Sequence, residues 1–209
     1  MTLSALPSAE ERRSVPVPRG WPAAGALPRG SVVTMGVFDG FHRGHEALVA
    51  RAVGHARRLN LPSVLVTFTP HPLTVLVPGA SPRQLMRLED RVEHARILGI
   101  DTVVVVPFTP ALARETAAHF VADGLVGRLG MRLLVVGSDF RCGHRGEGDV
   151  ARLAELGREH GFQVEPLDLV EAAGERCSST EIRRCLARGD LASAEELLGR
   201  RDDRVLVAR

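Results

Sequence analysis

The stretch SVVTMGVFDGFHRGH, residues 31–45, decides the fold. It opens with a run of β-branched and apolar residues, passes through a turn that holds Gly36 and Gly40, and ends where an amphipathic stretch begins at Arg43. A short apolar run predicts a buried strand, whereas apolar residues at every third or fourth position over a longer stretch predict a helix. The stretch is therefore typical of the first strand, turn and helix of an α/β domain.

The same alternation repeats along the chain and predicts an α/β fold of the Rossmann-like, doubly wound kind. We expect a mainly parallel five-stranded sheet with flanking helices, because strands that alternate with helices are joined by right-handed crossovers. Strands are expected at residues 31–37, 63–68, 101–106, 132–137 and 163–168. Helices are expected at residues 43–58, 88–98, 112–128, 149–160, 179–188 and 191–199. One domain would span residues 31–200, between a partly ordered N-terminal extension at 1–30 and a C-terminal tail at 201–209.

The composition excludes several chemistries. All 27 basic residues are arginines, and with neither lysine nor tyrosine the chain cannot have a Schiff-base lysine, a Walker A loop or a tyrosine acid. The net charge is only +2 and the arginines are spread along the chain, so no nucleic-acid or membrane partner is indicated. The three cysteines form no Cys-x-x-Cys pair, so we expect no disulfide framework, no zinc site and a cytoplasmic location. The oligomeric state is left open.

The turn after the first predicted strand is the first candidate site, because ligands of open α/β sheets bind where the strands end. His42 and His45 stand three positions apart in the opening turn of the helix, so their imidazoles share a face with the unpaired backbone N–H groups of that turn. Gly44 between them lets a ligand approach the backbone closely. These groups predict an anion site that needs no lysine and suits a phosphate. The alternative is that one histidine caps the helix and the other is a surface residue.

Three further segments follow predicted strands or open a predicted helix. In Thr67–Pro72, His71 lies between two prolines that stiffen the backbone on either side of it. Gly137–Gly148 is a glycine-rich loop in which Asp139 offers a carboxylate to a hydroxyl, an amide or a magnesium-bound water, or else forms an ordinary Asx turn. Ser178–Arg183 brings three hydroxyl groups and a guanidinium to one helix start, where they bind a polyphosphate or simply cap the helix.

Together these four segments resemble the FMN adenylyltransferase module of the bacterial FAD synthetases, a family of the HxGH nucleotidyltransferase superfamily. GVFDGFHRGH at 36–45 resembles the family's G-x-F-D-G-x-H-x-G-H element, and TFTPHP at 67–72, GSDFRCG at 137–143 and SSTEIR at 178–183 resemble three others. The resemblance runs from about residue 31 to residue 200. It implies transfer of AMP from ATP to FMN to give FAD and pyrophosphate. It also implies Mg²⁺ as cofactor, held mainly through the ATP phosphates and not by a protein cage.

The resemblance further implies which residues have which role. The catalytic contacts would come from His42, His45, Ser179, Thr180 and Arg183. ATP would be bound by Gly36, Val37, Phe38, Gly40, His42, Gly44, His45, Ser178, Ser179, Thr180 and Arg183. The flavin acceptor would be bound by Asp39, Phe68, Pro70, His71, Gly137, Asp139, Phe140 and Cys142.

The sequence departs from the family's pattern in two places. Cys142 stands where the family usually has phenylalanine, and the riboflavin kinase module of the bifunctional members is not among these residues. We therefore expect no riboflavin kinase activity in these residues, whether the chain is a stand-alone enzyme or a fragment of a longer one. Two other functions stay open. One is a paralogue that nucleotidylates a different phosphorylated acceptor, such as a flavin analogue, and the other is a non-catalytic flavin- or nucleotide-binding module.

Overall fold

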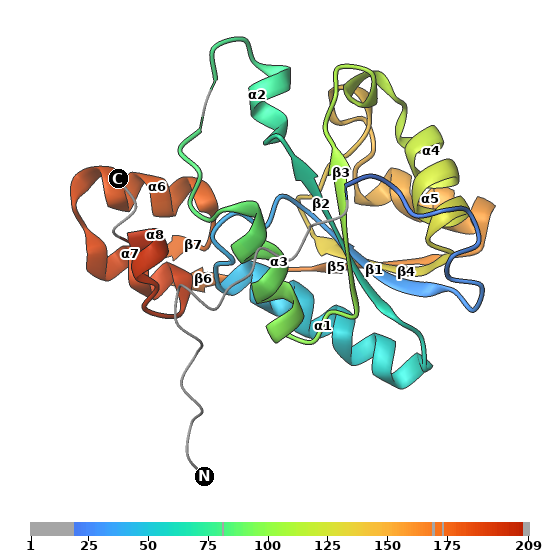
Figure 1. Cartoon of the computed structure of the whole chain (residues 1–209), viewed down its shortest axis with the longest axis horizontal. Coiled ribbons are helices and arrows are strands. Elements are labelled where there is room, and N and C mark those ends of the chain that lie inside the picture. Colours follow the sequence, from blue (N-terminus) through green and yellow to red (C-terminus); the bar gives the residue numbers. More distant parts are fainter. Residues whose placement is uncertain (1–18, 81, 169, 173, 207–209) are drawn as a thin grey trace.

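The centre of the molecule is a five-stranded parallel sheet (Figure 1), with the strand order β3-β2-β1-β4-β5. The structure, a computed structural model, describes residues 19–80, 82–168, 170–172 and 174–206. All five expected strands are present with bounds that differ by at most two residues, and the predicted fold class is confirmed. The strands span Ser31–Met35 (β1), Ser63–Thr69 (β2), Thr102–Pro107 (β3), Met131–Gly137 (β4) and Gln163–Leu167 (β5).

Helices cover both faces of the sheet, because alternate residues of each central strand are buried against opposite layers. Val33 of β1 packs in a cluster with Leu125 and Leu153, whereas its neighbour Val32 packs in a cluster with Ala52 of the first helix. This period-two burial on both faces explains why the strands read as continuous apolar runs. The helices that match the expected ones are Arg43–Leu59 (α1), Leu88–Ile97 (α3), Val150–His160 (α5), Ser179–Arg188 (α6) and Leu191–Leu198 (α7).

The later helices begin and end at residues that the sequence makes recognisable. Asp149, Ser178 and Asp190 each accept a hydrogen bond from the backbone N–H three positions further on. Such N-cap bonds are worth about 1 kcal/mol each. α5 and α6 end at Gly161 and Gly189, both in the left-handed conformation that glycine adopts without strain.

The prediction of a single helix over residues 112–128 is wrong. The chain instead forms a short 3₁₀ turn at Leu112–Arg114 (η1), one α-helical turn at Ala117–His119 (α4) and a π-helix at Phe120–Arg128 (η2). The side chain of Thr116 accepts a hydrogen bond from the backbone N–H of His119. It therefore starts a new helix within the expected one, since an N-cap residue has extended and not helical backbone angles.

The segment before β1 packs along the side of the sheet that carries η2. The backbone N–H of Gly20 donates a 2.7 Å hydrogen bond to the carbonyl of Val105 in β3. The ring of Trp21 lies 5.6 Å from the ring of Phe120, centroid to centroid. A Cβ atom on Gly124 would come within 2.7 Å of the indole, so this position of the π-helix admits only glycine beside the tryptophan. Residues 1–18 of the expected extension lie outside the described residues.

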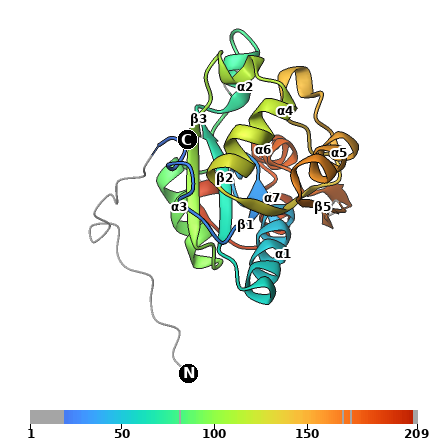
Figure 2. The same ribbon diagram turned by 90° about the vertical axis from the view of Figure 1, so that its right-hand side faces the viewer.

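Besides a 3₁₀ turn at His144–Gly146 (η3), three further short elements were not expected. α2 (Pro72–Leu76) stands at the top of the molecule in both Figure 1 and Figure 2. A two-residue hairpin, β6 (Glu171–Ala172) and β7 (Glu175–Arg176), precedes α6. The third, α8 (Asp203–Leu206), falls in the expected tail, yet its last two residues are buried in the same apolar cluster as α7.

No helix in the described part of the chain is long and apolar enough to cross a membrane.

Candidate active site

The loop between β1 and α1 is held in a strained conformation by two buried aromatic rings. Phe38 and Phe41 have φ angles of 53° and 45°, and Gly40 between them has a φ of 84°. Bulky residues rarely adopt such angles, so the surrounding structure must stabilise them. Both phenyl rings are fully buried and stack with their centroids 5.4 Å apart. The loop therefore delivers His42 to the start of α1 from a fixed position.

His42 and His45 lie stacked at the start of α1, with ring centroids 3.7 Å apart. Their Nδ1 atoms are buried and have no hydrogen-bond partner among the described residues. In the described part of the chain, the side chain of the N-cap residue His42 makes no capping hydrogen bond to the first turn of α1. Buried polar groups are normally hydrogen-bonded, so two unpaired imidazole nitrogens beside unpaired backbone N–H groups indicate a site for a polar ligand.

Both imidazoles are held neutral. Burial lowers the pKa of His42 to about 4, and the positive charges of Arg176 and Arg200 act in the same direction. Burial also holds the pKa of His45 well below its ordinary value, assisted by His42, Arg91 and Arg200. A neutral imidazole donates one hydrogen bond, and an anion placed against it would restore part of the lost basicity.

These histidines line a small cavity of about 170 Å³. Residues from the loops after β4 and β5 and from the start of α6 close it. Asp139 and Arg176 lie on its wall and form an ion pair with each other. The cavity is lined by Met35, Gly36, Phe38, His42, Gly44, His45, Leu48, Gly137, Asp139, Phe140, Leu167, Asp168, Val170, Arg176, Cys177 and Ser178.

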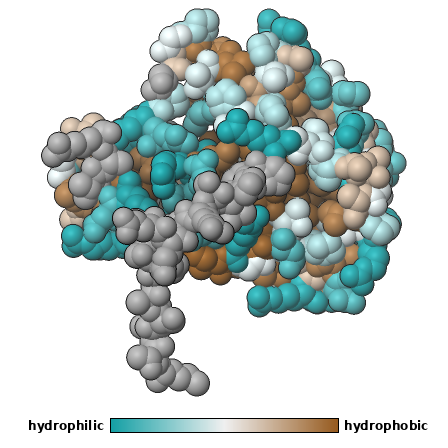
Figure 3. All heavy atoms as spheres, in the orientation of Figure 1, coloured by the Kyte–Doolittle hydropathy of each residue, from teal (hydrophilic) through white to brown (hydrophobic). Residues whose placement is uncertain are grey.

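A second, larger cavity of about 430 Å³ lies beside the first and is mostly apolar. The two cavities share Gly36 and Phe140 as lining residues, so the loops after β1 and β4 separate them. In Figure 3 apolar atoms are visible between the two upper lobes of the molecule, of which the left one carries α2. The lining residues are Gly36, Val37, Phe68, Pro72, Leu76, Phe108, Leu112, Ala113, Glu115, Phe120, Phe140, Arg141, Cys142, Gly143, Arg145 and Gly146.

Asp39 is placed differently from the expected acceptor role. Its side chain is 2% exposed and forms an ion pair with Arg183. The carboxylate also accepts hydrogen bonds from the backbone N–H groups of Leu85 and Met86, at 2.9 to 3.1 Å. Asp39 is absent from the described residues that line either cavity. Its oxygens are engaged by these contacts, so in this structure Asp39 anchors the loop.

Of the described residues at the start of α6 that were expected to bind phosphate, only Ser178 lines the small cavity with the histidines. Its hydroxyl also accepts the N–H of Glu181 as the N-cap of α6. The hydroxyl of Ser179 donates a 2.7 Å hydrogen bond to the backbone carbonyl of Asp39, and Thr180 is exposed. Arg183 also donates to the backbone carbonyl of Arg83 at 2.7 Å.

The expected acceptor group is divided between the two cavities. Phe68 and Cys142 line the large one, whereas Gly137 and Asp139 lie with the histidines. The reason is the strand order: β4 pairs directly with β1, so the start of the loop after β4 lies beside the loop after β1. Burial raises the pKa of the Cys142 thiol to about 12, with Glu147 contributing, so that the thiol stays protonated.

His71 and Pro70 lie at the start of α2. The imidazole Nδ1 of His71 accepts a 3.2 Å hydrogen bond from the backbone N–H of Leu73 and so caps this short helix. Burial lowers the pKa of His71, and the charge of Arg183 lowers it further. Neither His71 nor Pro70 is among the described residues that line the two cavities. From the same segment, Pro72 lines the large cavity.

Sequence reasoning missed several lining residues. Arg176 directly precedes the Cys-Ser-Ser-Thr run, so its position beside a motif was a usable signal. Phe108 directly follows β3, and the rule that sites form where strands end would have found it. Leu112 and Phe120 gave no such signal. A single helix was expected over these residues, whereas the chain forms separate helical segments there. In the described part of the chain, no group of three or more His, Cys, Asp or Glu residues could hold a metal ion.

A phosphate-sized cavity at a helix start and an apolar cavity beside it, both at the carboxyl edge of a parallel sheet, define a nucleotide-binding α/β protein. The family model described as FAD synthetase matches residues 25–181. The chain therefore belongs to the FAD synthetase family, which confirms the resemblance drawn from its motifs.

Relatives agree with this assignment. The bifunctional riboflavin kinase/FMN adenylyltransferase of Escherichia coli K12 is 40% identical over 174 residues, which cover 83% of this chain and 56% of the relative. The protein of the same name from Pseudomonas fluorescens is 42% identical over 172 residues, covering 82% and 55%. The chain thus spans about half the length of these relatives. A crystal structure named macrolide-efflux protein, from Streptococcus pneumoniae, matches with a TM-score of 0.72 and 28% identity, covering 82% of this chain and 57% of that one.

Proposed function

We propose that this chain transfers AMP from ATP to FMN and releases FAD and pyrophosphate. The observation that carries the proposal is the pair of adjoining cavities that share Gly36 and Phe140. One holds unpaired imidazole nitrogens at a helix start, and the other is apolar and large enough for a fused aromatic ring system. The reaction must join a phosphate of one nucleotide to a phosphate of the other, so two adjoining sites meet its first requirement.

The small cavity would take the α-phosphate of ATP. His42 and His45 would donate hydrogen bonds to its oxygens together with the first N–H groups of α1. Negative charge increases on these oxygens in the transition state, so the donors stabilise the transition state more than the ground state. Neutral imidazoles suit this task because they donate without the desolvation cost of a buried charge.

The chemistry needs no general base. The FMN phosphate oxygen is already anionic and attacks the α-phosphorus of ATP in line. The bond from this oxygen to the phosphorus forms while the bond to the bridging oxygen breaks, and pyrophosphate leaves with the electron pair. Catalysis is then positioning and charge stabilisation. The leaving pyrophosphate would be held by Arg176 and Ser178, with Ser179, Thr180 and Arg183 beside them at the start of α6.

The reaction would use Mg²⁺ together with ATP, and its positive charge would offset the negative charge of the phosphates. Mg²⁺ prefers oxygen ligands and keeps several waters. Asp139 and Asp168, the two carboxylates on the wall of the small cavity, have the right chemistry to hold such waters.

A cytoplasmic location is supported by the three cysteines, all of which are free thiols.

The test is direct assay of the purified protein. With ATP, FMN and Mg²⁺ it should produce FAD and pyrophosphate in equal amounts. His45→Ala should reduce turnover by about 10²-fold, as removal of one transition-state hydrogen-bond donor does elsewhere. His160→Ala is the matched control, because His160 is exposed at the end of α5. Absence of FAD at any enzyme concentration would exclude the proposal.

A further inference from the structure

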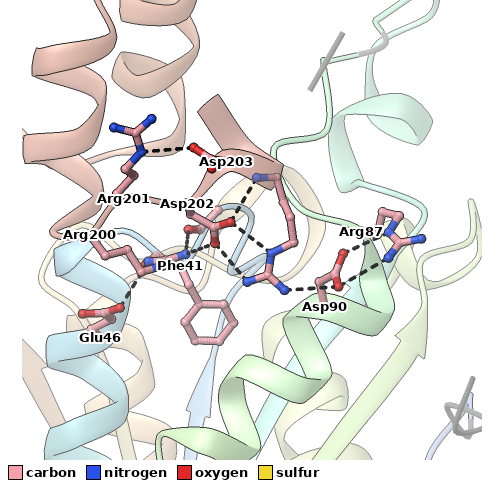
Figure 4. A network of polar contacts seen from close by, with 10 residues as sticks. Phe41, Glu46, Arg87, Asp90, Arg200, Arg201, Asp202 and Asp203 are labelled. Atoms are coloured by element: carbon pink, nitrogen blue, oxygen red, sulfur yellow. Dashed lines mark hydrogen bonds and ion pairs between the residues drawn. The ribbon is translucent and has the colours of Figure 1, made fainter. Parts of the chain in front are cut away.

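A network of polar contacts ties the C-terminal segment to the loop that carries the histidines (Figure 4). It begins at Arg200, just after α7 ends at the left-handed Gly199. Arg200 lies near Phe41 and Glu46 on one side and Asp202 on the other. It is 154 or more residues away in sequence from the residues of the loop and helix that it contacts, so only the tertiary fold brings it there.

The guanidinium of Arg200 holds two successive carbonyl groups of the loop. One of its NH₂ groups donates a 2.9 Å hydrogen bond to the carbonyl of Gly40, and the other donates to the carbonyl of Phe41. The carbonyl of Phe41 belongs to the peptide bond that leads into His42. Fixing these two carbonyls therefore fixes the direction in which the chain enters α1.

The same guanidinium is itself held by carboxylates on both sides. It contacts Glu46 of α1 at 3.2 Å and Asp202 at 3.3 Å. Asp202 also pairs with Arg204, which reaches Asp90 of α3 at 3.5 Å. The side chain of Arg200 is only 20% exposed, so its contacts are partly shielded from water.

The charge of Arg200 also reaches the imidazoles. It is one of the causes that lower the pKa of His42, after burial and Arg176 and against the opposing charge of Glu46. It acts likewise on His45, after burial, His42 and Arg91. Arg200 therefore influences both the place and the protonation of the groups that would meet the phosphate.

We propose that Arg200 is a positioning residue for nucleotidyl transfer, which aligns His42 and the first turn of α1 by clamping the carbonyls of Gly40 and Phe41. The inference rests on the function proposed above. It requires arginine in particular, because a planar guanidinium spans two carbonyls and two carboxylates at once, whereas a lysine ammonium is a single point charge on a flexible stem. Arg200 touches neither the reacting atoms nor the cavity wall. It acts through the loop.

The neighbouring arginine provides a matched control. Arg201 has a side chain that is 74% exposed and pairs only with Asp203 among the described residues, at 3.2 Å. Arg200→Gln and Arg201→Gln thus remove the same charge one position apart. We expect Arg200→Gln to lower kcat by about 10-fold or more with the KM for FMN changed less than about twofold, since a small misplacement far from the chemistry can cost 10²-fold. Arg201→Gln should match the parent, and Arg200→Lys should fall between the two.

A second measurement does not depend on the acceptor. The titration of the histidine imidazoles, followed by NMR, should show a higher pKa for His42 in Arg200→Gln than in the parent and no change in Arg201→Gln. A clamp that only stabilises the fold would lower the unfolding temperature but would leave kcat unchanged, whereas the titration reports the charge of Arg200 at His42. If no variant makes FAD, the function proposal fails, while the titrations still show whether the charge of Arg200 acts on His42.

Unchanged kcat in a folded Arg200→Gln protein would overturn the inference, and so would unchanged His42 titration. If Arg200→Gln does not fold, Arg200→Lys decides, because it keeps the charge and loses the two-carbonyl clamp. Parental kcat in Arg200→Lys would then exclude a positioning role.

Discussion

The buried, neutral state of His42 predicts that the protein loses stability as the pH falls below the ordinary imidazole pKa. In the folded protein the pKa of His42 is about 4, against 6.5 for an ordinary histidine. Between these two values the unfolded chain binds a proton that the folded chain refuses, so stability rises with pH in this window and is lost on acidification. The side chain is nearly buried, at 7% exposed, so water screens the effect little.

The magnitude follows from the two pKa values. Between pH near 7.5 and pH near 5, one such histidine removes about 2 kcal/mol from the free energy of unfolding. His45, whose pKa is also lowered by burial, adds to the loss in the same direction. For a domain that is stable by about 5–15 kcal/mol, this is a large change.

The assay is urea unfolding at both pH values for the parent, His42→Gln and the exposed control His160→Gln. The parent and the control should lose the same free energy between the two conditions. His42→Gln should lose about 2 kcal/mol less, because its side chain no longer titrates. The comparison uses the change with pH, so any general destabilisation by glutamine cancels. An equal pH dependence in His42→Gln and the parent would refute the reasoning.

Three further substitutions test other parts of the site. Arg183→Lys should weaken ATP use by about 10-fold or more in steady-state kinetics, since a lysine cannot keep both the pair with Asp39 and a second hydrogen bond; parental kinetics would contradict this. Cys142→Phe should restore the aromatic wall that the family usually has at the large cavity and lower the KM for FMN while leaving the KM for ATP unchanged, and a uniform effect on both would contradict the placement. Gly148→Ala should destabilise the protein by about 2 kcal/mol in urea unfolding, because the new Cβ would lie 2.5 Å from the Cβ of Ala117, and an unchanged midpoint would show that the loop yields freely.

The central strands could be predicted because most of their residues are buried on both faces of the sheet. Val32 and Val33 are adjacent and both inaccessible to water, so the strand shows as a largely apolar run and not as an alternation of apolar and polar residues. The π-helix at Phe120–Arg128 was not predicted, and Gly124 within it packs against Trp21, about a hundred residues away in the sequence. Local patterns carry no information about such distant partners.

The site was predictable as a set of motifs and not as a set of contacts. His42 and His45 lie on one face of a helix start, a relation that spacing alone determines. The pairing of Asp39 with Arg183 joins residues 144 positions apart, and nothing in the sequence marks Asp39 as an anchor rather than a ligand group. Asp139 lies in the small cavity with the histidines because β4 pairs with β1, and the sequence alone does not give this strand order.

The packing of Trp21 against Phe120 gives the protein a built-in optical probe. Trp21 is the only tryptophan and the chain has no tyrosine, so a single indole dominates the ultraviolet fluorescence. The centroid of its ring lies 5.6 Å from that of Phe120, which is itself part of the wall of the large cavity. A molecule that enters the cavity and displaces this wall would change the emission of one identified side chain. Occupancy could then be followed in the unlabelled protein, at equilibrium or on the time scale of mixing.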